Sequence, residues 1–179
     1  MLAIIVAVGM MKIFGLDVQL AKKLKRIIVM ANILRSPHIR PLSNQSIFLA
    51  GGISNCPDWQ RLATEYLMEE LKDTDLTIIN PRRVEDLTII PEEQIAWEFQ
   101  YLEEATRILF WFPSETLCPI TLFELGKCLV KCPEKLHIGC HPLYQRKLDV
   151  ITQVRLMYGW IQIHTDIFSL LNEVIVDVV

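Results

Sequence analysis

Short apolar runs alternate with amphipathic stretches along the chain after residue 26. Continuous apolar runs of this kind are typical of strands that are buried on both faces of a sheet. In the stretches between them, apolar residues recur every three or four positions, which indicates helices that pack by one face. The predicted strands are 26–34, 46–50, 76–80, 107–112, 136–140 and 160–164; the predicted helices are 58–71, 92–106, 119–131, 148–157 and a last one from Asp166.

Strands and helices that alternate in this way predict an α/β fold with a parallel sheet covered on both faces. We expect a flavodoxin-like or Rossmann-like three-layer sandwich with a five-stranded parallel sheet, and the run 26–34 is a candidate extra N-terminal strand. Counting 46–50 as the first strand, the expected strand order is 2-1-3-4-5. Such sheets bind ligands at the carboxyl ends of the first and third strands, which are followed here by GGISNCPDW and PSETLCPITLFELG.

The segment 1–25 is predicted to be an extension of a single domain formed by 26–179. Its apolar run before Lys12 is about half of the ~20 residues that a membrane span requires. It lacks the basic region and small-residue cleavage site of a secretory signal. We expect an appended strand or helix, or a start-site extension, and a membrane-associated segment remains the alternative.

Composition narrows the class of ligand. The chain is 51 % hydrophobic and 22 % charged, with a formal net charge of −3, which is typical of a globular protein. This balance provides no positive surface for a nucleic-acid polymer or an anionic membrane. We therefore expect a small-molecule ligand.

The five cysteines are predicted to be reduced thiols in a cytoplasmic protein, because their number is odd and no signal peptide is recognised. Cys128, Cys132, His137, Cys140 and His141 are close in sequence and resemble a set of zinc ligands. The paired CxxC knuckles of structural zinc sites are missing, so we expect no metal site.

Candidate site residues gather at the predicted carboxyl edge of the sheet. Gly51 and Gly52 allow the backbone to approach a ligand closely, and the helix that follows favours anionic or sugar oxygens at its N-terminus. Glu124 lies about one and a half turns inside the helix 119–131, so its side chain can point back over the sheet edge. The alternative for Glu124 is a solvated position on the helix surface.

Other polar residues near this edge have more than one interpretation. Asp58 is either a helix cap or a site carboxylate, and Glu98 is either a solvated helix residue or a site carboxylate. Arg82 is either part of a surface pair or a clamp for a phosphate or carboxylate. His141 and Tyr144 follow the fourth strand, where they line the cleft, line a subunit interface or belong to a helix-capping loop.

Four stretches together resemble the nucleoside 2-deoxyribosyltransferase superfamily, in particular its nucleoside 2-deoxyribosyltransferase-like branch. They are SIFLAGGISNCPDWQ, INPRR, WEFQYLEEATRILFWFPSETLCPITLFELG and IGCHPLYQRKLDVITQVRL, and the resemblance covers about 26–170. It implies a flavodoxin-like fold, an enzyme acting on nucleosides or nucleotides, and a homo-oligomer whose active sites include residues of a neighbouring subunit.

The resemblance also implies roles for individual residues. Glu124, in its FELG context, corresponds to the nucleophile of the family. Cys118 stands where other members carry an aspartate six residues before the nucleophile, and Ile120 stands where they carry a small residue. The pocket for the sugar and base is implied to include Ala50, Gly51, Gly52, Asp58, Gln60, Trp97 and Glu98.

The expected reaction is cleavage or transfer at an N-glycosidic bond through a glycosyl-enzyme intermediate on Glu124. Asp58 or Glu98 would supply the proton that the leaving base needs. Tyr101 or a helix amide would keep Glu124 ionised, and Arg82 would anchor a 5′-phosphate. This chemistry requires no metal or redox cofactor. Two alternatives stay open: a non-catalytic nucleotide- or nucleoside-binding module, and a hydrolase of another N-glycoside such as a nicotinamide dinucleotide.

Overall fold

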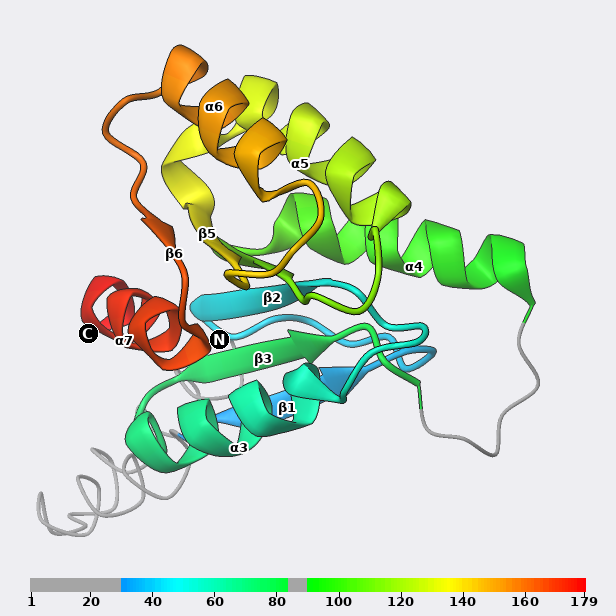
Figure 1. Ribbon diagram of the computed structural model, residues 1–179. Helices are drawn as coiled ribbons and strands as arrows, with labels where there is room; N and C mark the ends of the chain where they lie inside the picture. The colour runs from blue at the N-terminus through cyan, green and yellow to red at the C-terminus, as the bar shows by residue number, and fades with distance from the viewer. Residues whose placement is uncertain (1–29, 84–89) are drawn as a thin grey trace, which may run out of the picture.

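The computed structural model describes residues 30–83 and 90–179, and these residues form a parallel six-stranded sheet between two layers of helices (Figure 1). The strands are β1 (Asn32–Arg35), β2 (Gln45–Gly51), β3 (Leu76–Asn80), β4 (Arg107–Phe112), β5 (Leu136–Cys140) and β6 (Ile163–His164). The helices are α3 (Trp59–Glu70), α4 (Pro91–Glu104), α5 (Pro119–Lys131), α6 (Lys147–Met157) and α7 (Ile167–Val178), with a 3-10 turn, η1 (Pro133–Lys135).

The strand order is β1-β3-β2-β4-β5-β6. The five strands from β2 onward therefore have the predicted order 2-1-3-4-5, and the prediction of a flavodoxin-like three-layer fold is confirmed. The extra strand, β1, pairs with β3 at the outer edge. The predicted strand 160–164 is too long, because only Ile163 and His164 pair with β5 while Gly159 and Trp160 form a turn.

The sheet is buried on both faces because successive side chains of a strand point to opposite sides. In β2, Phe48 and Ala50 belong to the core cluster that includes buried residues of α4, α5 and α6. Ile47 and Leu49 belong to the cluster that includes α3 and α7. This double burial explains why the strands are continuous apolar runs in the sequence.

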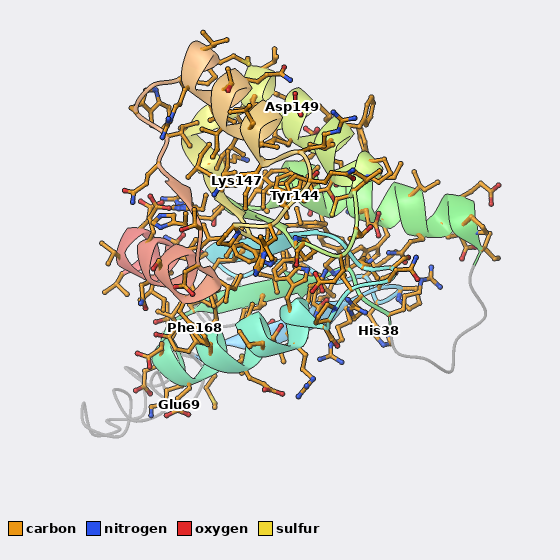
Figure 2. The ribbon with its side chains drawn as sticks, in the orientation of Figure 1. His38, Glu69, Tyr144, Lys147, Asp149 and Phe168 are labelled. Carbon is orange, nitrogen blue, oxygen red and sulfur yellow. The ribbon has the colours of Figure 1, made fainter. Side chains whose placement is uncertain are left out.

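Helix α7 contacts α3 near its start and strand β5 near its end. Near its start, the ring of Phe168 meets that of Tyr66 in α3 edge to face, with 5.3 Å between centroids (Figure 2). Near its end, His137 of β5 lies between two carboxylates, with Nδ1 3.1 Å from Glu173 Oε2 and Nε2 3.2 Å from Asp177 Oδ2.

Helix α5 begins at Pro119, the position at which the sequence predicts its start. Proline suits the first helical position because its missing N–H has no partner there. The preceding residue, Cys118, has left-handed backbone geometry with φ of 49°, which is uncommon for a residue other than glycine. The chain thus turns sharply at Cys118 and directs the first turns of α5 to the carboxyl end of β2.

The predicted extension 1–25 lies outside the described residues. In the described part of the chain, no helix is both long enough and apolar enough to cross a membrane. All five cysteines belong to the described residues and are free.

Candidate active site

A cavity of about 340 Å³ lies at the carboxyl ends of β2 and β4, the edge where the strand order predicts a ligand site. Its size falls within the range of about 300–1,000 Å³ that is usual for small-molecule sites. The residues that line it are Phe48, Ala50, Gly51, Gly52, Ile53, Ser54, Pro81, Glu98, Thr116, Cys118, Pro119, Ile120, Thr121 and Glu124.

Glu124 is half-buried in the second turn of α5 and lines this cavity. The pKa of its carboxyl group is raised to about 7: burial is the largest cause, the negative charge of Glu98 adds to it, and Lys127 partly opposes both effects. At neutral pH the group is therefore divided between its protonated and ionised forms. A carboxylate in this state is able to accept a proton or to act as a nucleophile.

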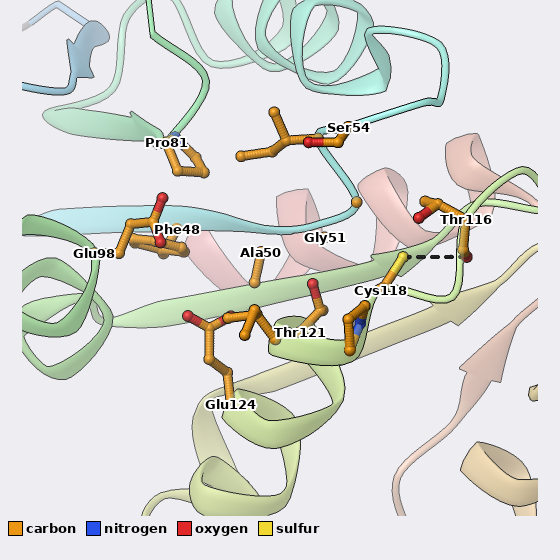
Figure 3. A pocket seen from close by; sticks show the side chains of 14 residues that line it. Phe48, Ala50, Gly51, Ser54, Pro81, Glu98, Thr116, Cys118, Thr121 and Glu124 are labelled. Atoms are coloured by element: carbon orange, nitrogen blue, oxygen red, sulfur yellow. Dashed lines mark hydrogen bonds between the residues drawn. The ribbon is translucent and has the colours of Figure 1, made fainter. Parts of the chain in front are cut away.

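Glu98 reaches the same cavity from α4. Figure 3 shows its carboxyl group at the same end of the cavity as that of Glu124. Burial raises the pKa of Glu98, and a hydrogen bond from Gln94 and the charge of Arg83 oppose that rise. Two carboxyl groups in one cavity, each favouring the neutral form, make an arrangement suited to acid–base and nucleophilic chemistry.

Ala50, Gly51 and Gly52 line the cavity, as the sequence predicts. Glycine is needed at position 51 because the backbone of β4 and a side chain of α3 pack closely against it. A Cβ atom there would lie 2.4 Å from the backbone oxygen of Trp111 and 2.4 Å from Cζ2 of Trp59. Gly51 is thus required by the fit of β2 against its neighbours, whether or not a ligand approaches it.

At Gly52 a Cβ atom would instead meet the side chains of the opposite cavity wall, at 2.7 Å from Thr116 Cγ2 and 2.9 Å from Cys118 Sγ. Glycine here keeps the two walls close to each other. The thiol of Cys118 hydrogen-bonds to Thr116 O at 3.5 Å (Figure 3), and burial raises its pKa to about 11. Cys118 therefore presents a neutral thiol to the cavity.

Gln60, Asp58 and Arg82 lie behind the cavity wall and support it. Gln60 is fully buried and donates from Nε2 to Gly52 O at 3.2 Å, while its Oε1 accepts from Arg82 Nη2 at 3.2 Å. Asp58 caps α3 by accepting from Arg61 N at 3.0 Å, and it pairs with Arg82 Nε at 3.0 Å. Asp58 thus has the helix-cap role, and the Arg82 guanidinium already has partners for two of its nitrogens.

Two predicted site residues of α4 are turned into the core instead of the cavity. Trp97 is buried and donates from Nε1 to His38 O at 2.8 Å. The hydroxyl of Tyr101 accepts from Arg40 N at 3.0 Å and donates to Arg40 O at 3.1 Å. The hydroxyl of Tyr101 is therefore bonded to Arg40, and the predicted contact between Tyr101 and Glu124 is not made.

The two candidates after β5, His141 and Tyr144, also do not line the cavity. Tyr144 lies beside α6 (Figure 2) and donates to Leu117 O at 2.9 Å, so it braces the loop that leads to α5. His141 accepts from Leu143 N at 3.2 Å through Nδ1. His141 thus shapes the local turn, which is the loop interpretation of this segment.

Sequence reasoning missed several cavity residues. For Thr121 a signal was present, because it precedes Glu124 by three positions and so shares its helix face. Phe48 gave no signal, since it is one of several apolar residues in a buried strand. In the described ranges, no group of three or more His, Cys, Asp or Glu side chains is arranged to hold a metal ion.

In a comparison with known families, residues 44–144 match the family described as "Nucleoside 2-deoxyribosyltransferase like". The match covers more than half of the 179-residue chain and includes both cavity carboxyl groups. The comparison with curated proteins found no match.

Proposed function

The chain belongs to the nucleoside 2-deoxyribosyltransferase-like family, and from this premise we propose that its cavity cleaves or transfers the N-glycosidic bond of a deoxynucleoside, nucleoside or nucleotide. Family membership supports glycosyl transfer in general. The observation that carries the more specific proposal is the pair Glu98 and Glu124, two carboxyl groups with raised pKa that face one cavity at the switch point of the sheet.

Glu124 is the proposed nucleophile. Its carboxylate oxygen bonds to the anomeric carbon as the bond from that carbon to the base nitrogen breaks, and the bonding electrons leave with the base. Water or the nitrogen of a second base then attacks the same carbon and releases the Glu124 carboxylate. The pKa of about 7 supports this role, because a substantial fraction of Glu124 is ionised at neutral pH.

Glu98 is the proposed general acid. The departing base needs a proton on its ring, and a carboxylic acid that stays neutral near pH 7 is able to supply it. Burial in the cavity wall favours the neutral form of Glu98. Asp58, the other acid that the sequence suggests, is committed to the helix cap and to Arg82, so Glu98 is the better candidate.

We also propose that the protein is a homo-oligomer. Five exposed apolar side chains lie on α4 and α5, the two helices that carry the cavity carboxyl groups; they are Ile95, Phe99, Ile120, Phe123 and Val130. An exposed apolar surface of this kind is typical of a protein–protein interface. Its position beside the cavity supports association through this side of the molecule.

The proposed reaction is tested by incubating the purified protein with deoxynucleosides, ribonucleosides and their 5′-monophosphates, with and without a second free base. Release of free base without an acceptor indicates hydrolysis, and formation of a new nucleoside indicates transfer. Glu124→Gln should abolish both, whereas Glu115→Gln, a change in the loop before α5, should keep them.

Two other results would change the proposal. Tight, stoichiometric binding of a nucleoside without turnover would indicate a binding module if Glu124→Gln left that binding unchanged. Release of nicotinamide from a nicotinamide dinucleotide, without reaction of ordinary nucleosides, would indicate a hydrolase of another N-glycoside.

A further inference from the structure

Gln94, in the first turn of α4, joins three segments of the chain beside the cavity. Its Oε1 accepts hydrogen bonds from Ser36 Oγ (2.5 Å) and from Arg83 Nε, and its Nε2 donates to Pro81 O (3.2 Å) and to Glu98 Oε1. A glutamine amide has two acceptor lone pairs and two N–H donors. Every hydrogen-bonding position of Gln94 is therefore occupied, and its side chain is held in one place.

The orientation of this amide follows from the chemistry of its neighbours. Pro81 O is only an acceptor and Arg83 Nε is only a donor, so the amide nitrogen must face Pro81 and the amide oxygen must face Arg83. A flipped amide would set two donors against each other at Arg83 and two acceptors against each other at Pro81. The second N–H of Gln94 consequently points at Glu98.

Glu98 lines the cavity, whereas Gln94 does not. Within 30–83 and 90–179, the hydrogen bond found for the Glu98 carboxyl group is the one from Gln94 to Oε1. We propose that Gln94 is a positioning residue for Glu98: it holds Oε1 as an acceptor and leaves the proton of the neutral acid on Oε2, where the leaving base can take it. The inference rests on the proposed role of Glu98 as general acid.

The same contact limits how tightly Glu98 holds its proton. A hydrogen bond donated to a carboxyl group favours the ionised form, and burial favours the neutral form. Burial is the larger effect at Glu98, and the Gln94 bond and Arg83 oppose it. Without the Gln94 amide, the proton would be held more tightly and on either oxygen, so Glu98 would be a weaker and less directed acid.

Two variants of Gln94 and one matched control test this role. Gln94→Leu removes all four hydrogen bonds at similar volume, and Gln94→Glu keeps the acceptor for Ser36 and Arg83 but removes the N–H donors. The control is Gln100→Leu, because Gln100 lies on the same helix and donates to Glu104 at the same spacing of four residues, but on the exposed surface.

The first measurement is the titration of the Glu98 carboxyl carbon by NMR in the free protein, assigned with Glu98→Gln. The Glu98 carboxyl group should titrate at higher pH in both Gln94 variants than in the parent protein. In Gln100→Leu it should titrate as in the parent. This readout needs no turnover. It would overturn the inference if the Glu98 titration were the same in all four proteins.

The second measurement is the pH dependence of base release. We expect kcat to fall about tenfold or more in Gln94→Leu and Gln94→Glu, with KM little changed. The loss should not exceed the 10²–10⁴-fold that a general acid contributes as a whole. The alkaline limb of the profile should move to higher pH. Base release with unaltered profiles in both variants would overturn the role of Gln94 and leave the proposed function intact; a shifted Glu98 titration without base release from any substrate would overturn the proposed function instead.

Discussion

The negative charge of Glu98 on α4 raises the pKa of Glu124 on α5 across the cavity that both residues line. Each carboxyl group therefore influences the protonation state of the other. Two carboxyl groups that interact in this way lose their protons in two steps, and between the steps one group is ionised while the other is neutral. This is the combination that a nucleophile and a general acid require.

The first prediction concerns the pH dependence of the reaction. With a pKa of about 7, Glu124 is increasingly protonated below that pH and loses its nucleophilic form. We expect kcat/KM for base release to fall about tenfold per pH unit below pH 7 and to level off above it. A rate that is independent of pH between 5 and 7 would exclude Glu124 as the ionised nucleophile.

The second prediction separates the role of Glu98 from that of Glu124. Glu98→Gln should lower kcat for an ordinary purine deoxynucleoside by about 10²–10⁴-fold. It should have a much smaller effect on a 7-methylpurine nucleoside, whose cationic base leaves as a neutral molecule without a proton. Equal losses on both substrates would mean that Glu98 does not act as the acid.

The third prediction concerns the two glycines of opposite environment, Gly51 and Gly126. A Cβ atom at 51 meets the Trp111 backbone at 2.4 Å, whereas at 126 nothing lies within 4 Å. We expect Gly51→Ala to destabilise the fold by about 1–3 kcal/mol, as overpacking does. Gly126→Ala should stabilise α5 by about 0.5–1 kcal/mol. Denaturant unfolding of both variants tests this, and equal effects would contradict it.

The fourth prediction concerns stability in acid. Burial opposes ionisation of Glu173, but the hydrogen bonds and charges of His137 and His164 together outweigh it, so the pKa of Glu173 is lowered. The hydrogen bond from Arg107 is the largest cause that lowers the pKa of Asp177. A carboxyl group with a lowered folded-state pKa stabilises fully above its unfolded value, and this stability disappears as pH falls through the folded value.

Thermal unfolding between about pH 5 and pH 2 covers that window. Glu173→Gln and Asp177→Asn should each show a smaller loss of Tm across it than the parent protein. The control is Glu65→Gln, since Glu65 forms only an exposed pair with Arg61 on α3. A parent Tm that does not fall in acid would contradict the prediction.

The fifth prediction concerns the proposed interface. Phe123, on α5, is 75 % exposed, and Val176, on the opposite side of the sheet in α7, is 80 % exposed. Phe123→Glu should convert the oligomer to a monomer in light scattering coupled to size-exclusion chromatography. Val176→Glu should leave the oligomer unchanged. A parent protein that is monomeric at high concentration would refute the oligomer.

Much of the sheet could be predicted from the sequence alone. The apolar runs that became β2, β3, β4 and β5 are continuous because both faces of each strand are buried, and their spacing leaves room for one helix between successive strands. Alternation of this kind limits the topology strongly. The strand order, and with it the position of Glu124 at the carboxyl edge, followed from the pattern.

The tertiary structure decided which polar and aromatic residues reach the cavity. Trp97, Tyr101 and Glu98 are neighbours on α4, yet the rotation of this helix against Phe48 buries the two aromatic rings and turns only Glu98 to the cavity. Helical periodicity cannot fix that rotation when apolar residues occur on more than one side. Tyr144 lies before α6 and supports a loop through its hydrogen bond to Leu117 O, a residue far away in the sequence.

Contacts between segments that are distant in the chain also could not be predicted from the sequence pattern. The fixed amide of Gln94 depends on groups from the ends of β1 and β3, and the pKa of Glu124 depends on burial and on Glu98. The amino-acid sequence by itself determined the layers and the helix that carries Glu124, because these follow from local periodicity, and it limited the strand order. Only the packing of α4 and α5 over the sheet edge decided which carboxyl group shares the cavity with Glu124. The reason is that burial and charge at the cavity are set by residues that are far apart in the chain.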